Sequence, residues 1–249
     1  MFCEKMHDME HPSQSEANYP FPDDSHYKDL IGDSFELAKR TVYIHKGEKY
    51  PLPAFTFNHL SKDGQLGTAN ILALKAKSKG FKLIYEIGYG TSLSPLDSAF
   101  SETDSVVLGF DPNGKFPEKI QAGTEDLAFP KTKTGSLAAL FSLDASDLIK
   151  TGFPKASRLQ CISPYPTMVR DMILLGSKLS NRVDILPNPN MVDPKEFEEI
   201  IKNLPNHISG EVLYLNKEGL IKEIGTSKSS YIFPSAQEKV PLIKINTKI

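Results

Sequence analysis

Residues 82–113 restrict the possible folds more than any other stretch of this 249-residue chain. An apolar run at 81–87 is followed by a turn that contains Gly88 and Gly90, then by a short polar segment. A second apolar run, at 105–110, ends in Asp111. This order predicts a strand, a glycine turn, a helix and a parallel second strand, because parallel strands need a crossover connection that is usually helical. The stretch therefore predicts a right-handed βαβ unit.

Both ends of this unit suit a ligand that contains a nucleoside. Without side chains, Gly88 and Gly90 let the backbone N–H groups of the turn approach a bound group. Asp111 follows the second strand, at the edge where open α/β sheets bind ligands, and an acid there can accept hydrogen bonds from a ribose diol. A dinucleotide fingerprint requires G-x-G-x-x-G, but the third glycine position holds Leu93. The spacing from Gly88 to Asp111 suits either a dinucleotide or another nucleoside cofactor.

The rest of the chain predicts an α/β fold with a doubly wound, mostly parallel sheet. Apolar faces at helical spacing indicate helices at 167–179 and 194–204. Short apolar runs bounded by turn residues predict further strands at 136–144, 158–162, 183–186, 210–216, 231–234 and 240–245. Residues 217–219 are expected to form a turn, and the last strands an antiparallel hairpin.

The chain divides into three parts by composition. Residues 1–28 are polar and broken by prolines, so we expect a flexible tail. Residues 29–80 are expected to form an N-terminal helical cap, with helical patterns at 29–40 and 67–79 and a strand that turns at Gly47. Residues 81–249 are expected to form the cofactor-binding domain.

Bulk properties exclude some classes of protein. A net charge of -2 creates no global basic field, so tight nonspecific binding of nucleic acid is not predicted, although a local basic patch stays possible. Cys3 and Cys161 lie far apart in sequence, which argues against a disulfide framework and fits a reducing compartment. No apolar run approaches the roughly 18 residues of a membrane span, and the start of the chain does not resemble a signal peptide. We therefore expect a cytoplasmic protein without a membrane anchor.

The sequence also contains a possible set of metal ligands and two histidines that could act as bases. Cys3, His7 and His11 are spaced by four residues and would share one face of a helix as soft metal ligands. Because Pro12 would end such a helix and no fourth ligand is near, we expect no metal site. His45 and His59 could each act as a general base, but a packing or surface role is commoner for such residues.

Residues 86–92, EIGYGTS, resemble motif I, E-x-G-x-G-x-G, of the Rossmann-like S-adenosylmethionine-dependent methyltransferases, with Ser92 in place of the last glycine. The late antiparallel hairpin agrees with the fold of that family. The resemblance implies S-adenosylmethionine as cofactor and Glu86, Gly88 and Gly90 as residues that bind it. It also implies that Asp111 binds the ribose and that Asp144, after the third strand, contacts the adenine.

The sequence SPYP at 163–166 follows the predicted strand 158–162, where the family places its catalytic or substrate-facing motif. Methyltransferases that act on amino groups carry D/N-P-P-Y/F there. Pro164 and Tyr165 match that pattern, and Ser163 replaces the acid or amide. The resemblance implies Ser163 and Tyr165 as catalytic residues, while the same residues are also ordinary turn formers.

The resulting hypothesis is methyl transfer from S-adenosylmethionine to an unidentified acceptor, which could be a small molecule, a nucleic acid or a protein. The cofactor is already reactive, so the protein mainly has to orient the acceptor and exclude water. Two alternatives stay open at this point. One is a non-catalytic Rossmann-like binding or scaffolding protein, in which Ser92 and Ser163 mark lost chemistry. The other is an enzyme that uses a nicotinamide or another nucleotide.

Overall fold

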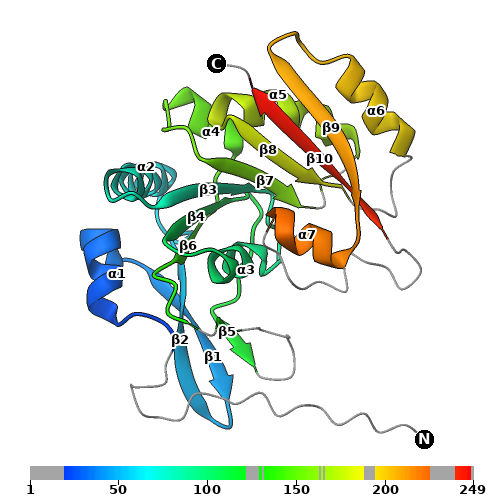
Figure 1. Cartoon of the computed structure of the whole chain (residues 1–249). Helices are drawn as coiled ribbons and strands as arrows, with labels where there is room; N and C mark the ends of the chain where they lie inside the picture. Colours follow the sequence, from blue (N-terminus) through cyan, green and yellow to red (C-terminus); the bar gives the residue numbers. More distant parts are fainter. Residues whose placement is uncertain are drawn as a thin grey trace, which may run out of the picture.

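The computed structural model describes residues 20–121, 129–130, 132–162, 164, 166–187, 194–224 and 239–247. They form a ten-stranded sheet with helices on both faces (Figure 1). The strands are β1 Lys39–His45, β2 Glu48–Thr56, β3 Lys82–Ile87, β4 Ser105–Phe110, β5 Lys119–Gln121, β6 Leu137–Phe141, β7 Arg158–Ile162, β8 Arg182–Leu186, β9 Ile208–Leu215 and β10 Val240–Thr247. The α-helices are α1 Asp24–Ile31, α2 Lys62–Ser78, α3 Ser94–Ser101, α4 Ala145–Lys150, α5 Val169–Leu179, α6 Pro194–Lys202 and α7 Lys217–Ile224, with 3-10 turns at Gly32–Phe35 and Pro166–Met168.

The predicted doubly wound, mostly parallel sheet is confirmed. The strand order is β5-β1-β2-β6-β4-β3-β7-β8-β10-β9, and the five strands from β6 to β8 are parallel. The chain runs outward from β3 to β4 and β6, and then returns to the other side of β3 with β7 and β8. The strand order therefore reverses between β3 and β7, and ligands of open α/β sheets bind outside the carboxyl ends of the strands at such a point.

The late antiparallel pair is also confirmed, because β10 lies between β8 and β9 and runs antiparallel to both. The expected turn at 217–219 is instead the first turn of α7. The Asn216 side chain accepts a hydrogen bond from the Gly219 N–H at 2.9 Å, which starts a helix rather than a hairpin. Leu220 and Ile224, four residues apart, are buried against the sheet. The strand predicted at 231–234 lies outside the described residues.

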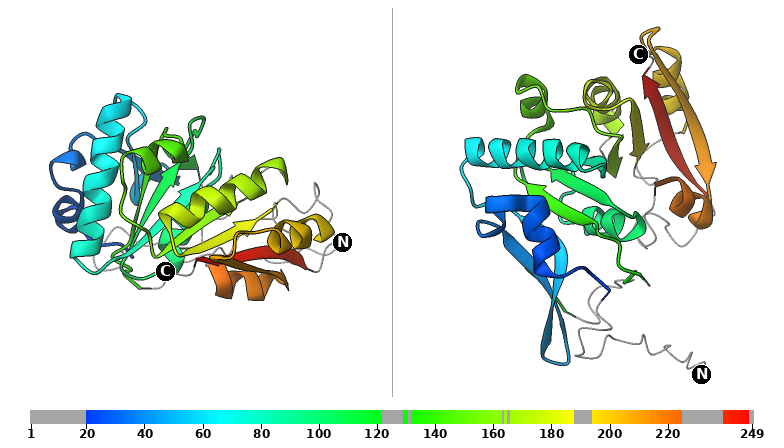
Figure 2. Two further views of the ribbon diagram at one scale, coloured as in Figure 1. Left: turned by 90° about the horizontal axis from the view of Figure 1, so that it is seen from above. Right: turned by 60° about the vertical axis from the view of Figure 1, so that its left-hand side comes forward.

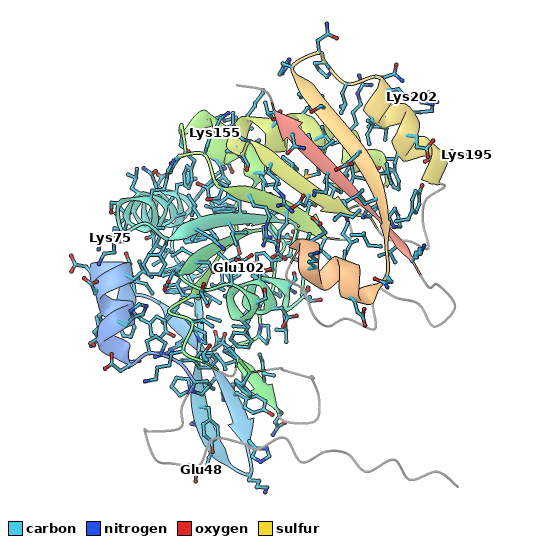
Figure 3. All side chains as sticks on the ribbon, viewed as in Figure 1. Glu48, Lys75, Glu102, Lys155, Lys195 and Lys202 are labelled. Atoms are coloured by element: carbon cyan, nitrogen blue, oxygen red, sulfur yellow. The ribbon has the colours of Figure 1, made fainter. Side chains whose placement is uncertain are left out.

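The segment expected to form a helical cap contributes two strands to the sheet. β1 and β2 pair as an antiparallel hairpin, and β2 then pairs in parallel with β6. The hairpin projects from the body of the molecule, with Glu48 near its tip (Figure 3). The proline-rich residues 50–55 thus extend the sheet instead of covering it. The division at residue 80 into a cap and a cofactor-binding domain stays a prediction.

The last part of the segment predicted to be a tail, from residue 20 on, packs against the rest of the chain. Phe21 is buried, and its ring stacks on that of Phe100 with 5.2 Å between centroids. Asp23 caps α1 by accepting a hydrogen bond from the His26 N–H at 3.2 Å, and Tyr27 is buried under the helix. These aromatic side chains bury enough apolar surface to order a polar segment. Residues 1–19, with Cys3, His7 and His11, lie outside the described residues.

The two faces of the sheet carry different helices. Leu83, Tyr85 and Ile87 of β3 point into a core that α1, α2, α4, α5 and α6 cover, whereas Ile84 points toward α3. α7 packs on the same face as α3 but over β8 and β10, so α5 and α7 lie on opposite sides of the sheet (Figure 2). This alternation is expected for a strand that is buried on both faces. None of the described helices is long and apolar enough to cross a membrane.

Four polar residues form a row across the α3 and α7 face of the sheet. Glu86 of β3 is the cross-strand partner of Gln160 of β7, which is the partner of Asp184 of β8. Asp184 in turn pairs with Lys244 of β10. Cross-strand partners point to the same face of a sheet, so these four side chains form a line across it, which we name the polar row.

Candidate functional site

The predicted glycine turn leaves open space beside its backbone. Gly88 and Gly90 have φ angles of 73° and 60°, which side chains other than glycine rarely adopt. A Cβ at Gly90 would meet no atom within 4 Å, and one at Gly88 would meet only the Cys161 sulfur, at 4.0 Å. The turn therefore has room for a ligand along its backbone, next to the point where the strand order reverses.

Tyr89, between the two glycines, points inward rather than toward that space. Its side chain is buried, and burial raises its pKa well above the usual range. The ring packs where Cβ atoms on Gly109 and Gly114 would collide with it. Tyr89 thus fixes the glycine turn to the end of β4 and is not directed toward a ligand.

Asp111 lies where the sequence placed it, at the carboxyl end of β4, and it joins two loops. One carboxylate oxygen accepts a hydrogen bond from the Gly90 N–H at 2.8 Å, and the other accepts one from the Asn113 N–H at 2.7 Å. The Lys115 N–H also donates to the Gly90 carbonyl at 2.8 Å. A carboxylate offers about four acceptor positions, so Asp111 can hold the turn and still accept hydrogen bonds from a ligand.

Glu86, predicted to bind the cofactor, is fully buried beneath the turn. One carboxylate oxygen accepts a hydrogen bond from the Ser94 hydroxyl, and the other accepts one from the Gln160 amide at 2.6 Å. Burial raises the pKa of Glu86 to about 7, against the opposing effect of these two hydrogen bonds. Because Glu86 precedes the turn and Ser94 follows it, their hydrogen bond joins the two ends of the turn.

Gln160 was missed by the sequence reasoning. Its amide nitrogen donates to Glu86 and also to the Ser98 hydroxyl of α3, at 2.7 Å. It therefore ties β7 to both β3 and α3. The available signal was a pair of polar residues, Arg158 and Gln160, at alternate positions of a short apolar strand, which marks one face of that strand as polar.

Ser92 stands where the resembling motif has its last glycine. Its hydroxyl oxygen accepts a hydrogen bond from the Ser94 N–H at 3.0 Å, and its own N–H donates to the Tyr89 carbonyl at 2.9 Å. The first N–H groups of a helix have no partner within that helix. The serine therefore closes the turn and satisfies one N–H group at the start of α3.

Asp144 follows β6, next to the Asp111 loop, and is exposed at the surface. Its carboxylate caps α4 by accepting a hydrogen bond from the Ser146 N–H at 2.7 Å, and the hydrogen bonds from Ser146 lower its pKa. The Asp111 N–H donates to the Phe141 carbonyl at 3.2 Å, so the loops after β4 and β6 lie side by side. The structure thus brings Gly88, Gly90, Asp111 and Asp144 to one edge of the sheet.

The remaining candidates lie elsewhere or cannot be placed. Ser163 and Tyr165 lie outside the described residues, whereas Pro164 between them is buried directly after β7, across the reversal point from the glycine turn. His59 is exposed between β2 and α2. His45 belongs to the β1–β2 hairpin, where it pairs with Glu48 near the tip.

No protein-family model matches the sequence, and no curated protein matches it. Solved structures of similar fold include an antibiotic-related methyltransferase, with 14% identity, 75% of this chain and 93% of that chain covered, and a TM-score of 0.46. The 16S rRNA (adenine(1408)-N(1))-methyltransferase from Catenulisporales acidiphilia has 13% identity, with 77% of this chain and 95% of that chain covered and a TM-score of 0.46. An O-methyltransferase from Bacillus cereus in complex with SAH has 12% identity, with 91% and 92% covered and a TM-score of 0.38. At these identities the likeness concerns the fold alone.

Proposed function

We propose that the chain is an S-adenosylmethionine-dependent methyltransferase with an acceptor still to be identified. The observation that carries this proposal is the open backbone of Gly90 facing the Asp111 carboxylate where the strand order reverses. A glycine turn after the first strand and an acid after the second strand are the two elements that hold the nucleoside part of a cofactor in such sheets.

The residues of the site fit this cofactor. The turn has space beside Gly88 and Gly90, and Asp111 retains acceptor capacity for the ribose hydroxyls. We assign contact with the base to Asp144, which is exposed after the end of β6. When bound, the cofactor supplies a methyl group on a sulfonium that is reactive without further activation. The chain's own residues would hold the cofactor and orient the acceptor.

The charge around the turn supports this cofactor over a dinucleotide. Glu86 is buried under the turn, and Asp97 lies in the first turn of α3, close enough to Glu86 to contribute to its raised pKa. A pyrophosphate is favoured at a helix N-terminus by positive charge, and the Asp97 carboxylate opposes it there. S-adenosylmethionine carries a positive sulfonium and a positive amino group beside one carboxylate, and its net positive charge suits an acidic surrounding.

For the acceptor side, we propose that Ser163 and Tyr165 contact the acceptor. This proposal is supported by the position of β7, which runs parallel beside β3 and ends at Ile162, so that both strands end at the same edge of the sheet. A small molecule, a nucleic acid and a protein all remain candidate acceptors. The two widely separated cysteines fit a protein of the cytoplasm.

Calorimetry tests this function and the role of Asp111 together. We expect the wild-type protein to bind S-adenosylmethionine and S-adenosylhomocysteine but not NAD. Asp111→Asn should weaken binding of S-adenosylhomocysteine by roughly ten- to a hundredfold, because it removes charge-assisted hydrogen bonds to the ribose. Asp171→Asn, an exposed acid on α5, is the matched control and should leave the affinity unchanged.

Two results would contradict the proposal. Binding of NAD without a response to either methyl cofactor would exclude a methyltransferase. Unchanged affinity in Asp111→Asn would show that Asp111 only joins the two loops. Transfer of a labelled methyl group to fractionated small molecules, RNA and protein then separates an enzyme from a non-catalytic binding protein, which would bind the cofactor without turnover.

A further inference from the structure

The loop that follows β6 is held by a buried side chain of a distant helix. Gln65 of α2 is 4% exposed. Its side-chain oxygen accepts a hydrogen bond from the Ser142 N–H at 2.7 Å, and its amide nitrogen donates to the Leu60 carbonyl at 3.0 Å. Ser142 is the first residue after β6, so Gln65 satisfies a partly buried backbone donor where the strand ends.

The segment around Gln65 makes three further contacts with the same region. The Phe57 N–H donates to the Leu140 carbonyl at 2.9 Å, and the Phe57 ring stacks on that of Phe141 with 5.2 Å between centroids. Lys62 forms an ion pair of 2.8 Å with Asp147 in the first turn of α4. Residues 57–65 therefore contact both sides of the 142–144 loop, from the end of β6 to the start of α4.

The 142–144 loop is the part of the candidate site where a base would lie. β6 is the third parallel strand from the reversal point, and its carboxyl end lies next to Asp111, the acid assigned to the ribose. A nucleoside that extends from the glycine turn across Asp111 brings its base to this loop. The hydrogen bond from Ser142 to Gln65 therefore governs the backbone that the base would meet.

We propose that Gln65 is a positioning residue of the cofactor site, which sets the 142–144 loop for recognition of the adenine. This inference rests on the proposed function. Glutamine suits the position because it offers an acceptor to Ser142 and a donor to Leu60 at the same time. Leucine provides neither group, whereas glutamic acid keeps an acceptor for the Ser142 N–H in either protonation state.

The test compares Gln65→Leu and Gln65→Glu in the full-length protein. The ligands are S-adenosylhomocysteine and its analogue in which hypoxanthine replaces adenine, and both affinities are measured by calorimetry. We expect Gln65→Leu to weaken binding of S-adenosylhomocysteine by roughly tenfold, which is the effect of losing one hydrogen bond between the 142–144 loop and the base. In Gln65→Leu, the ratio of the affinities for the adenine and hypoxanthine ligands should fall toward one. Gln65→Glu should restore the ratio of the wild type.

A stability control separates positioning from general loss of structure. Ile245→Ala removes a buried side chain of β10, on the other side of the reversal point from β6, and should lower the melting temperature without changing the base preference. Hydrogen exchange of peptides that contain Ser142 should be faster in Gln65→Leu than in either wild type or Ile245→Ala.

The possible failures are distinguishable. If wild type binds S-adenosylhomocysteine and Gln65→Leu retains both its affinity and its base preference, the role of Gln65 is excluded while the proposed function stands. A Gln65→Leu variant that loses affinity for both ligands equally also excludes it, since the base would not be involved. If wild type binds neither ligand, both the proposed function and this inference are overturned.

Discussion

The two carboxylates of the polar row lie in different surroundings. Glu86 is buried among neutral donors, the Ser94 hydroxyl and the Gln160 amide. Asp184 accepts hydrogen bonds from the Arg182 guanidinium at 2.9 and 3.2 Å. Glu86 supports the glycine turn, whereas the partner of Asp184, Arg182, joins β8 to the C-terminal end of α7.

The difference lies in how each carboxylate is compensated. Burial raises the pKa of both acids, but Arg182 opposes the rise at Asp184 through a direct ion pair, whereas Arg158 acts on Glu86 only at longer range. Glu86 therefore takes up a proton near neutral pH. One row of a sheet can therefore hold both a structural ion pair and a proton-sensitive support for a binding loop.

Breaking the ion pair between Arg182 and Asp184 should have the largest effect on stability. Arg182→Leu leaves the Asp184 carboxylate buried without its partner, and it also removes the hydrogen bond from Arg182 to the Glu223 carbonyl at 3.1 Å. We expect the free energy of unfolding to fall by roughly 3 kcal/mol, the low end for broken buried pairs, because Asp184 is buried but Arg182 is partly exposed. Urea denaturation measures the loss.

The same experiment needs a partner variant to identify the cause. Asp184→Asn in the Arg182→Leu background removes the buried charge that Arg182 no longer offsets, and it should recover a large part of the lost stability. No recovery in the double variant would mean that the arginine acts through packing and its contact with α7, rather than through the charge of Asp184.

The contribution of Glu86 should instead be visible in the pH dependence of stability. The pKa of Glu86 is raised from 4.5 to about 7 in the folded protein. Between these values the folded state holds a proton that the unfolded state has lost, so the contribution of Glu86 to stability is full below 4.5 and falls as the pH rises toward 7. Glu86→Gln cannot titrate and should lack this decline.

Urea denaturation at several pH values, from about pH 5 to about pH 8, measures the effect as the difference between wild type and Glu86→Gln. Wild type should lose at most about 3 kcal/mol relative to the variant across this range, the value for a shift of this size. Glu211→Gln, an exposed acid on the edge strand β9, is the control and should follow wild type. A difference that does not vary with pH would show that Glu86 is ionised throughout.

The strands of the central sheet were predicted well from the sequence, because the signals for them lie within each short segment. Runs bounded by turn residues predicted strands at 105–110 and 158–162, and β4 and β7 have those bounds. The position of Asp111 followed from the same pattern. The start of α7 was missed, because Asn216 was assigned to the strand 210–216 and Gly219 is an ordinary turn former, whereas the Asn216 side chain caps a helix.

The chemistry of the polar row could not be predicted in the same way. The hydrogen bond between Glu86 and Gln160 joins residues 74 positions apart and depends on the register of β3 against β7. Register is determined by packing of the whole sheet, and a shift of one residue would reverse every side chain. The contact between Gln65 and Ser142 likewise depends on how α2 packs, which no local pattern encodes.

The smallest expected effect concerns Lys244, the last residue of the polar row. Lys244 forms an ion pair of 2.9 Å with Glu223 of α7, where both side chains are partly exposed, and this hydrogen bond lowers the pKa of Glu223. Lys244→Met should reduce the free energy of unfolding by less than about 1 kcal/mol near neutral pH. Because the folded pKa is lowered, this contribution exists above the unfolded pKa and is lost as the pH falls, which is the opposite trend to that of Glu86. Denaturation of Lys244→Met across the same pH series should therefore show a deficit that shrinks in acid, and a deficit that instead grows in acid would mean that the lysine stabilises the sheet by means other than its charge.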